Sequence, residues 1–489
     1  MATLEAVVGE SASGTTHKTN AVHRVDHETV PDSARAYSEH LAAFTYDDLP
    51  PSVVEATKAS ILDTIGCAFA GTSSLDVKRL LELARADGDG DTTVWGTGGI
   101  KLPAAAAVMV NAATIHQDDF DDTSEFGPSH PTSASFPVAL AMAETLGGKT
   151  GRDLILAVAL GNDVTCRLSR AIVGRVFEHP WFRPPVLGLF GATAAAGVIA
   201  GADAEQHYQG LGLSLPMVGG TWASLHEVNS SVRSIRDGLA YRNAILATRM
   251  ARSGLRGDPN PFDGKYGLFQ AYYQGEYRPE DITSELGEFF EAERISLKPW
   301  PSNRLLHNTI TAVLETMEAN DLYFEDVESV EFQVGFINGT RCYPVAKGLV
   351  PDRRIDLLPN LPFNVAAAIR HRGIPLALYH DGAVADEVIE VAMPKVSWIT
   401  DPAQDTTDSY EVARVQIRTV SGEVFNGECN KARGHPQNPM SIENRHSKFR
   451  DCMKYAAIPV DPAAVDAIID CVERLESLDS VEELLALMR

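Results

Sequence analysis

Most of the residues able to move a proton or hold a charged ligand lie in one stretch of the sequence, residues 111–137. It contains four aspartates, two histidines and a threonine: Asp118, Asp119, Asp121, Asp122, His116, His130 and Thr123. A histidine titrates near neutral pH and can transfer a proton, and a neighbouring carboxylate can orient it or act as a second base. Apolar, alanine-rich segments flank the stretch, so its carboxylates have little room to reach water and need partners. We therefore interpret residues 116–130, hereafter the acidic loop, as a functional site rather than a solvated connection.

A different chemistry also fits these aspartates. Residues 118–122 match the DDxxD pattern with which all-helical prenyl-diphosphate enzymes bind magnesium, since carboxylates one helical turn apart can bridge metal ions to a diphosphate. The second magnesium motif of such enzymes, NxxxSxxxE, does not occur, because Asn229 is followed four residues later by Arg233. Aromatic residues make up only 7% of the chain, few for a pocket that encloses a polyprenyl group. Activity in excess EDTA distinguishes this interpretation from a metal-free proton-transfer site.

The size and charge of the chain limit what it binds. With 489 residues, of which 44% are hydrophobic and 22% charged, the chain is typical of a globular enzyme with two domains. Its formal net charge of -24 argues against nucleic acid and anionic membrane as partners. An anionic substrate requires a few cations gathered in one pocket, so we expect the site between the domains to be locally positive.

The sequence contains no signal for a membrane or an oxidising compartment. The six cysteines are scattered without a CxxC pair, which predicts reduced thiols in a cytoplasmic protein. The longest apolar run, residues 186–202, is shorter than the roughly 20 residues of a membrane span. Residues 1–32 are polar and lack the apolar core of a signal peptide, so we predict a disordered tail.

Helical periodicity dominates the chain up to residue 294. Apolar residues recur at three-, four- and seven-residue spacing in residues 52–72, and further helices are predicted over 75–86, 103–116, 133–146 and 152–170. We therefore predict a large all-α helical domain over residues 33–294, with the acidic loop between two of its helices.

After residue 294 the pattern becomes that of a mixed domain. Alternating or β-branched residues predict strands over 327–334, 388–393, 414–420 and 423–428, the last two as a hairpin. Helical periodicity resumes at residue 442. We predict a mainly α fold in which residues 295–431 form a smaller α+β lid domain and residues 432–489 return to the helical domain. The junction near Lys298 then lies at the site.

Five segments in a fixed order resemble the MmgE/PrpD family. They are LDTIG at 62–66, the acidic loop with its FDDT and later His-Pro pair, GLFGATA at 188–194, SLKPWPSNRLLH at 296–307 and GHPQNPM at 434–440. The family includes 2-methylcitrate dehydratase, cis-aconitate decarboxylase and iminodisuccinate epimerase. The resemblance implies a homodimer whose helical domain carries an α+β lid. For the decarboxylase branch it also implies a site without a metal ion or organic cofactor.

The resemblance assigns roles to individual residues. Asp119, Thr123 and His130 match residues that line the family's active site, and we predict His130 and Asp119 to be catalytic. Lys298 matches a lysine that holds a substrate carboxylate, and Arg233 stands in place of a second such lysine. An arginine keeps the charge and grips a carboxylate with its planar fork, but it does not donate a proton near neutral pH.

Further residues near this predicted site differ from the family pattern or add to it. Asn303 stands in place of a histidine, Phe363 in place of a tyrosine, and residues 181–185 (WFRPP) in place of another histidine. We expect Arg304 to help offset the substrate carboxylates and Phe363 to line the substrate site. His307 is predicted to be a core histidine.

Together these residues predict a cofactor-independent lyase, a decarboxylase or dehydratase, that acts by proton transfer on a small di- or tricarboxylate. Epimerisation of an imino-dicarboxylate is the alternative reaction, and a catalytically inactive dimeric binding protein is an alternative of another class. The three reactions share one requirement, because each develops charge on carbon beside a carboxylate that fixed cations hold.

Overall fold

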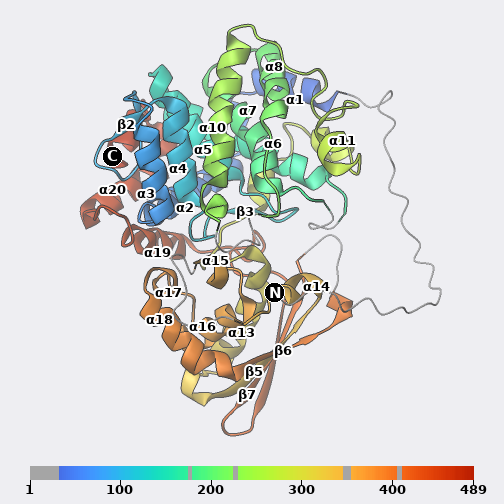
Figure 1. Cartoon of the computed structure of the whole chain (residues 1–489), viewed down its shortest axis with the longest axis vertical. Coiled ribbons are helices and arrows are strands. Elements are labelled where there is room, and N and C mark those ends of the chain that lie inside the picture. Colours follow the sequence, from blue (N-terminus) through green and yellow to red (C-terminus); the bar gives the residue numbers. More distant parts are fainter. Residues whose placement is uncertain (1–31, 175–178, 224–229, 345–353, 405–409) are drawn as a thin grey trace, which may run out of the picture.

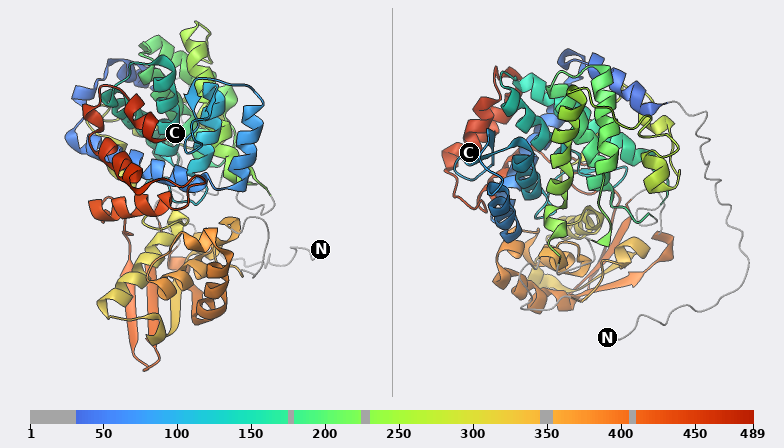
Figure 2. Two further views of the ribbon diagram at one scale, coloured as in Figure 1. Left: turned by 90° about the vertical axis from the view of Figure 1, so that its left-hand side faces the viewer. Right: turned by 45° about the horizontal axis from the view of Figure 1, so that its top comes forward.

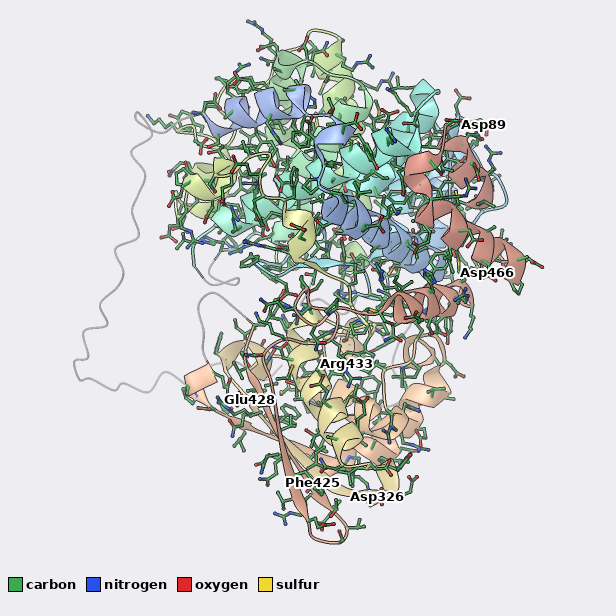
Figure 3. The ribbon with its side chains drawn as sticks, turned by 180° about the vertical axis from the view of Figure 1, so that it is seen from behind. Asp89, Asp326, Phe425, Glu428, Arg433 and Asp466 are labelled. Atoms are coloured by element: carbon green, nitrogen blue, oxygen red, sulfur yellow. The ribbon has the colours of Figure 1, made fainter. Side chains whose placement is uncertain are left out.

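The computed structural model describes residues 32–174, 179–223, 230–344, 354–404 and 410–489. The chain forms a larger helical part and a smaller α+β part (Figures 1 and 2). Seen from behind, Asp466 belongs to the helical part and Phe425 to the α+β part (Figure 3). The predicted mainly α fold is confirmed. The predicted disordered tail, residues 1–32, lies outside the described residues except for Asp32, which caps the first helix.

The helical part is built mostly from the chain before residue 284. Its helices are α1 (Ser33–Ala43), α2 (Pro51–Gly71), α3 (Leu75–Arg85), α4 (Ala104–Ile115), α5 (Pro131–Leu146), α6 (Gly151–Ala171), α7 (Arg183–Ile199), α8 (Ala204–Ser214), α10 (Val232–Arg252), α11 (Leu268–Tyr273) and α12 (Glu280–Thr283). The five helices predicted from periodicity correspond to α2 to α6, with ends that differ by no more than two residues. No helix among the described residues is both long and apolar enough to cross a membrane.

Local signals explain where the helices around the acidic loop begin and how they pack. α6 begins at a capping box, in which the Asp153 carboxylate accepts from the Thr150 backbone N–H at 2.8 Å. α5 begins with Pro131, whose missing N–H costs nothing at that position. α10 crosses α4 closely, since a Cβ on Gly238 would lie 2.0 Å from the Met109 carbonyl oxygen. This close contact sets the position of α10 beside the loop that follows α4.

The α+β part is a four-stranded sheet covered by helices. The strands are β5 (Val327–Val334), β6 (Val396–Thr400), β7 (Ala413–Thr419) and β8 (Val424–Cys429), in the order β6-β5-β7-β8. β5 pairs parallel with β6, and the other pairs are antiparallel. The longer helices are α13 (His307–Ala319) and α16 (Leu361–His371), and the short ones are α14 (Phe336–Gly339), α15 (Arg354–Leu357), α17 (Ala377–His380) and α18 (Gly382–Glu387).

Alternation along the strands places one face of this sheet in a core. Val415 and Ile417 of β7 are buried while Gln416 between them is exposed, so the apolar face turns toward the helices. α13 lies directly on β8, because a Cβ on Gly427 would meet Thr316 Oγ1 at 2.0 Å. The core of the α+β part is therefore closed by α13 and α16.

One predicted strand is wrong. Residues 388–393 continue α18 as a helical turn, Val388–Ala392, and the parallel edge strand is instead β6. Val388 and Ala392 are fully buried in the core beside α16. A short apolar run does not by itself distinguish a buried strand from a buried helical turn, and here packing against α16 decides. The strands predicted over 327–334, 414–420 and 423–428 are confirmed as β5, β7 and β8, with ends within one residue.

The last helices of the chain, α19 (Ile442–Met453), α20 (Pro462–Glu473) and α21 (Glu482–Leu487), share a hydrophobic core with α2 and α6. Phe449 of α19 packs closely against Gly66 of α2, since a Cβ added to Gly66 would lie 3.1 Å from Phe449 Cδ2. Lys448 of α19 also connects that helix to α2 and to the acidic loop through its charged ammonium group. Its Nζ lies 2.6 Å from Asp63 Oδ1, donates to the Phe120 carbonyl at 2.7 Å and lies 3.8 Å from the Phe120 ring centroid.

We expect Lys448→Met to lower the free energy of unfolding by about 3 kcal/mol, because the buried Asp63 would lose its cation. Arg450→Met is the matched control on the same helix. Arg450 pairs with Asp466 at the surface, where such a pair contributes less than about 1 kcal/mol. Urea unfolding of both variants checks the difference, and equal effects would show that Lys448 does not hold α19 to the helical part.

Candidate active site

The acidic loop reaches the start of the α+β part through a short sheet. β3 (Thr123–Ser124) pairs antiparallel with β4 (Ile295–Ser296) at the boundary between the two parts (Figure 1). Lys298 follows β4 and donates from Nζ to the Asp119 carboxylate at 2.6 Å and to the Asp119 carbonyl at 2.8 Å. Asp119 has a φ of 48°, a left-handed conformation that costs free energy in a residue other than glycine. The two contacts from Lys298 stabilise that conformation.

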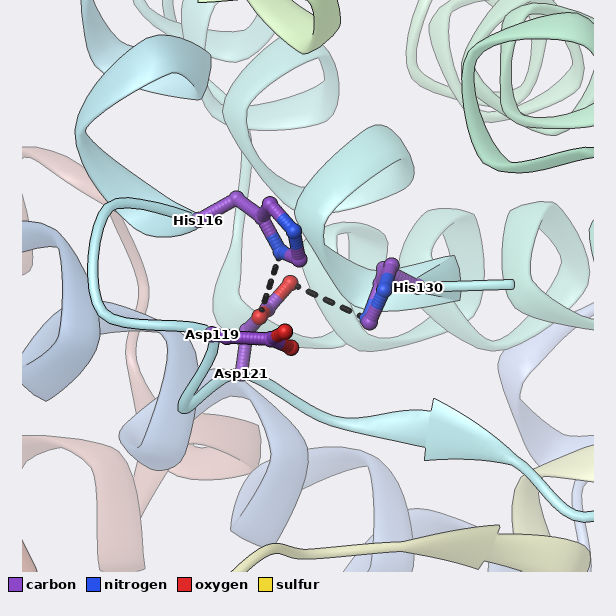
Figure 4. A group of neighbouring side chains, drawn as sticks. All are labelled: His116, Asp119, Asp121 and His130. Carbon is purple, nitrogen blue, oxygen red and sulfur yellow. Dashed lines mark hydrogen bonds and ion pairs between the residues drawn. The ribbon is translucent and has the colours of Figure 1, made fainter. Parts of the chain in front are cut away.

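Asp121 binds both histidines of the acidic loop (Figure 4). Its Oδ1 lies 2.8 Å from His116 Nδ1, and its Oδ2 lies 3.3 Å from His130 Nδ1. Oδ2 also accepts a hydrogen bond from Ser133 Oγ at 2.6 Å. Burial opposes ionisation of Asp121, but the two histidines and Lys298 outweigh it and hold its pKa far below the usual range. One ionised carboxylate thus positions two imidazole rings whose centroids are 4.5 Å apart.

His130 is held as a neutral base. Its Nδ1 lies 2.7 Å from the Asp122 carbonyl oxygen, which only accepts hydrogen bonds, so Nδ1 carries the proton and Nε2 keeps its lone pair. Burial lowers the pKa of His130 to about 4, although Asp121 opposes the shift. At neutral pH the imidazole is therefore uncharged and can accept a proton at Nε2. Because His130 is the N-cap residue of α5, the start of that helix fixes its position.

Asp122, in contrast, keeps its proton. Burial raises the pKa of Asp122 to about 8, and the charge on Asp121 adds to the shift, despite a hydrogen bond from the Thr132 backbone N–H at 3.3 Å. A neutral carboxylic acid thus follows an ionised carboxylate in the sequence. Two titratable groups with opposite protonation states are typical of sites that perform acid and base chemistry.

Two cations from different parts of the fold meet at Asp119. Lys298 comes from the start of the α+β part, and Arg233 of α10 places its NH2 3.1 Å from Asp119 Oδ2. All three side chains are buried. Burial opposes ionisation of Asp119, yet Lys298 and the neighbouring cations hold its pKa well below the usual range. With one carboxylate between two cations, these three groups carry a net positive charge.

The predicted substrate ligand Arg304 is held by a protein carboxylate. Its Nε and NH2 donate to the two carboxylate oxygens of Glu125, each at 3.0 Å. Glu125 also accepts a hydrogen bond from Ser296 Oγ, and His435 Nε2 lies 3.5 Å from its Oε2. This bidentate pair joins the acidic loop to the short helix Arg304–Leu306. A role for Arg304 in substrate binding stays a prediction.

Phe363 lies in the core of the α+β part. It is fully buried, and its ring centroid is 6.4 Å from that of Tyr379. The Tyr379 hydroxyl donates to Asn364 Oδ1 at 2.8 Å. Burial raises the pKa of Tyr379 well above its usual range, and the charge on Asp118 adds to the shift. The next residue, His380, places Nε2 3.1 Å from Asp118 Oδ2 and so ties α17 to the acidic loop.

The other predicted residues near the site have structural contacts. Thr123 is buried in β3 opposite Ser296. Asn303 caps the short helix that follows it by accepting from the Leu305 backbone N–H at 3.1 Å. His307 is fully buried, as predicted, and its Nε2 lies 3.0 Å from Ser302 Oγ.

Sequence reasoning did not assign roles to His116 and Asp121, although both stand in the acidic loop. Spacing did not indicate which of the four aspartates binds an imidazole. The five-residue separation of His116 and Asp121 becomes a contact only because the chain reverses after α4, at Asp119. The contact between His380 and the loop joins residues 262 positions apart, for which the sequence has no local signal.

Four side chains could also present ligand atoms to a metal ion: His116, Asp119, Asp121 and His130, with atoms within 4.8 Å of one another. However, Lys298 Nζ lies 2.6 Å from Asp119 Oδ1 and 4.0 Å from Asp121 Oδ1, so an ammonium group already stands among these carboxylates. A divalent cation would be repelled by that charge or would have to displace it. We therefore assign charge compensation in this cluster to Lys298.

Comparison with known protein families matches both parts of the chain. The MmgE/PrpD N-terminal domain matches residues 35–280, and the MmgE/PrpD C-terminal domain matches residues 300–475. The chain belongs to the MmgE/PrpD family. The two matched ranges include the acidic loop, Arg233 and Arg304, whereas Lys298 stands between them.

Curated relatives of this MmgE/PrpD chain span nearly its whole length. Cis-aconitate decarboxylase of Mus musculus is 24% identical over 455 residues, which is 90% of each chain. The Homo sapiens protein of the same name is 25% identical over 459 residues, 90% of this chain and 91% of its own. Cis-aconitate decarboxylase of Aspergillus terreus is 25% identical over 467 residues, 90% of this chain and 93% of its own.

We expect the activity of this MmgE/PrpD protein to survive excess EDTA, because Lys298 supplies the positive charge that a metal ion would otherwise bring. The measurement is turnover before and after dialysis against EDTA, with and without added Mg²⁺. Loss of activity on dialysis and its recovery with Mg²⁺ would instead favour the metal-binding interpretation of residues 118–122.

Proposed function

We propose that this MmgE/PrpD protein is a lyase that moves a proton on a small di- or tricarboxylate, without a metal ion or organic cofactor. One observation carries the proposal: the neutral imidazole of His130, held by Asp121, in the same loop as Asp119 with its two buried cations. The relatives named cis-aconitate decarboxylase support a substrate of this class. The cytoplasmic location predicted from the cysteines is compatible with six free thiols and stays a prediction.

Lys298 and Arg233 are the proposed ligands of the substrate carboxylates. Each contacts Asp119, so an incoming carboxylate would share these cations with Asp119 or replace it. A buried hydrogen bond between charged groups contributes about 1.5 to 3 kcal/mol. The guanidinium of Arg233 can bind a carboxylate through two parallel hydrogen bonds, whereas Lys298 offers one compact charge.

Two net reactions fit these groups. In decarboxylation, the bond between a carbon and the departing carboxylate breaks, and CO2 leaves. The electron pair left behind is delocalised toward a neighbouring carboxylate that the cations hold, and an imidazolium then delivers a proton to carbon. In dehydration, neutral His130 removes a proton from carbon and the C–H electron pair forms the new double bond. Hydroxide then leaves as water, with a proton from an acid such as Asp122.

The pKa of His130 in the protein without substrate distinguishes its role as a base from its role as an acid. With a pKa of about 4 the ring accepts a proton at neutral pH but does not donate one. Donation would first require a bound polyanion to raise this pKa, since nearby negative charge favours the imidazolium. The same resting state makes epimerisation the second candidate, because its first step is removal of a proton from carbon beside a carboxylate.

Proton NMR of the purified protein in D2O, with cis-aconitate, 2-methylcitrate, citrate and iminodisuccinate, tests the proposal. A lyase converts one of these compounds with loss of CO2 or water and places deuterium at a defined carbon. An epimerase exchanges a C–H for C–D without changing the carbon skeleton. A binding protein without catalytic activity leaves all four unchanged, and that outcome would overturn the proposal.

We expect His130→Gln to lower kcat by about 10²- to 10⁴-fold with little change in KM, since positioned proton transfer contributes that much. If His130 is the base, kcat/KM of the unaltered protein falls as the pH drops through about 4, because the imidazolium formed there cannot accept a proton. A fall as the pH rises from 5 to 7 would assign it as the acid. His446→Gln, a partly exposed histidine paired with Glu473, is the control and should keep full activity.

We also propose that the protein is a homodimer that associates through α10 and α3. Val232, Leu239 and Leu246 of α10 are 45%, 42% and 50% exposed and recur every seven residues, so they lie along one face of the helix. Leu75 and Leu83 of α3 are 50% and 65% exposed. α3 packs against α10, and Ser231 Oγ donates to Asp76 Oδ1 across the two helices. Exposed apolar residues gathered on two packed helices are typical of protein interfaces.

The double variant Leu239→Glu/Leu246→Glu is expected to be monomeric, because each subunit would place charges in the apolar interface. Light scattering coupled to size-exclusion chromatography measures the mass. The control is Val420→Glu, which changes an equally apolar residue that is 67% exposed at the β7–β8 turn and should leave the dimer intact. A double variant that stays dimeric would place the interface elsewhere.

A further inference from the structure

Arg236 is a buried cation that the proposed mechanism does not use. It follows Arg233 by three residues on α10, so their side chains occupy neighbouring positions on one side of the helix. Arg236 is only 4% exposed, and its Nε, NH1 and NH2 make no hydrogen bond with any part of the chain that the structure describes. A guanidinium carries five N–H donors, and buried donors are normally satisfied.

The groups around Arg236 fix the position of its guanidinium but accept none of its hydrogen bonds. Its guanidinium lies 4.2 Å from the ring centroid of Phe182, the residue before α7, so one face of the fork is covered. Asp237 Oδ1 is 3.5 Å from Arg236 Nε, an ion pair too long to count as a hydrogen bond. Asp237 is itself buried, and neither of its carboxylate oxygens is hydrogen-bonded within the described ranges. Stacking on Phe182 leaves the edge of the guanidinium, where the N–H groups point, to meet an acceptor in its plane.

The charge of Arg236 also interacts with charged residues of the candidate active site. Burial lowers the pKa of Arg236; the charge on Arg233 adds to that shift, and the charges on Asp237 and Asp119 oppose it. An arginine stays charged even when its pKa falls somewhat. The site therefore contains a third buried cation, with hydrogen-bonding capacity that no described side chain uses.

We propose that Arg236 binds a carboxylate of the substrate, one beyond those held by Lys298 and Arg233. The inference rests on the proposed function and deepens it, because three separate cations match a tricarboxylate better than a dicarboxylate. The guanidinium of Arg236 would form two parallel hydrogen bonds with the carboxylate. The carboxylate would lie in the plane of the guanidinium, whose position is set by stacking on the Phe182 ring. Arg236 would then determine which polycarboxylates the site accepts.

Direct binding tests this assignment independently of turnover. Isothermal titration calorimetry with tricarballylate, glutarate and methylsuccinate compares one tricarboxylate with two dicarboxylates that each lack one of its carboxylates. We expect Arg236→Gln to weaken tricarballylate binding about tenfold to a hundredfold, as loss of a charged hydrogen-bond pair should. The same variant should leave the affinity for one of the two dicarboxylates unchanged. Arg236→Lys, which keeps the charge but loses the fork, should fall between the two proteins.

Two further variants keep the test interpretable. Arg236→Gln/Asp237→Asn removes both buried charges, so it should fold even if the single variant does not, and it should show the same loss of tricarballylate affinity. Arg252→Gln changes an exposed arginine at the end of α10 and should bind like the unaltered protein.

Unchanged tricarballylate affinity in the folded variants would overturn the assignment, as would an equal loss for all three ligands or no binding by the unaltered protein. A protein that binds through Arg236 but converts no carboxylate in the NMR experiment would contradict the proposed function and leave this inference standing.

Discussion

Burial of the acidic loop is the constraint on which the rest of this structure depends. Five carboxyl groups lie within eight residues, at Asp118, Asp119, Asp121, Asp122 and Glu125, and the four aspartates are almost completely buried. A buried carboxylate without a partner costs several kcal/mol, so each must be paired or protonated. The fold pairs four of them and leaves Asp122 protonated. Asp121 is paired within the loop, but the cations that pair with the other carboxylates come from elements far apart in the sequence, on both sides of the boundary between the helical and α+β parts.

The same arrangement prepares the loop for chemistry. Lys298 and Arg233 both contact Asp119, whose left-handed conformation costs free energy in a residue other than glycine. The turn at Asp119 brings Asp121 back under His116, and Asp121 in turn orients His130. Because the loop is fixed from several sides, the two imidazoles need little reorganisation before a proton moves. In the proposed function, the contacts that stabilise the acidic loop are therefore the same contacts that position His130 for proton transfer.

Local sequence signals were enough to locate the acidic loop and most of the fold. The helices α2 to α6, the strands β5, β7 and β8, and the candidate residues Asp119 and His130 all follow from periodicity, residue type or the order of short motifs. What local signals could not reveal are contacts made across the chain. Lys298 meets Asp119 over 179 positions, and the apolar run at residues 388–393 became a helical turn because α16 packs on it. Arg236 looked like an ordinary helix residue until its burial and unmade hydrogen bonds were known.

The central claim is that burial keeps His130 neutral and that the Asp122 carbonyl holds its proton on Nδ1, which leaves the lone pair on Nε2. Nitrogen NMR of protein labelled with ¹⁵N-histidine tests this claim most directly, since the shifts of the two ring nitrogens report which one carries the proton. At pH 7 we predict a His130 signal with Nδ1 protonated and Nε2 bare, assigned by its absence in His130→Gln. That tautomer should persist in Asp121→Asn, because the Asp122 carbonyl still accepts the Nδ1 proton. A His130 ring that is protonated on both nitrogens at pH 7, or on Nε2 alone, would contradict the account.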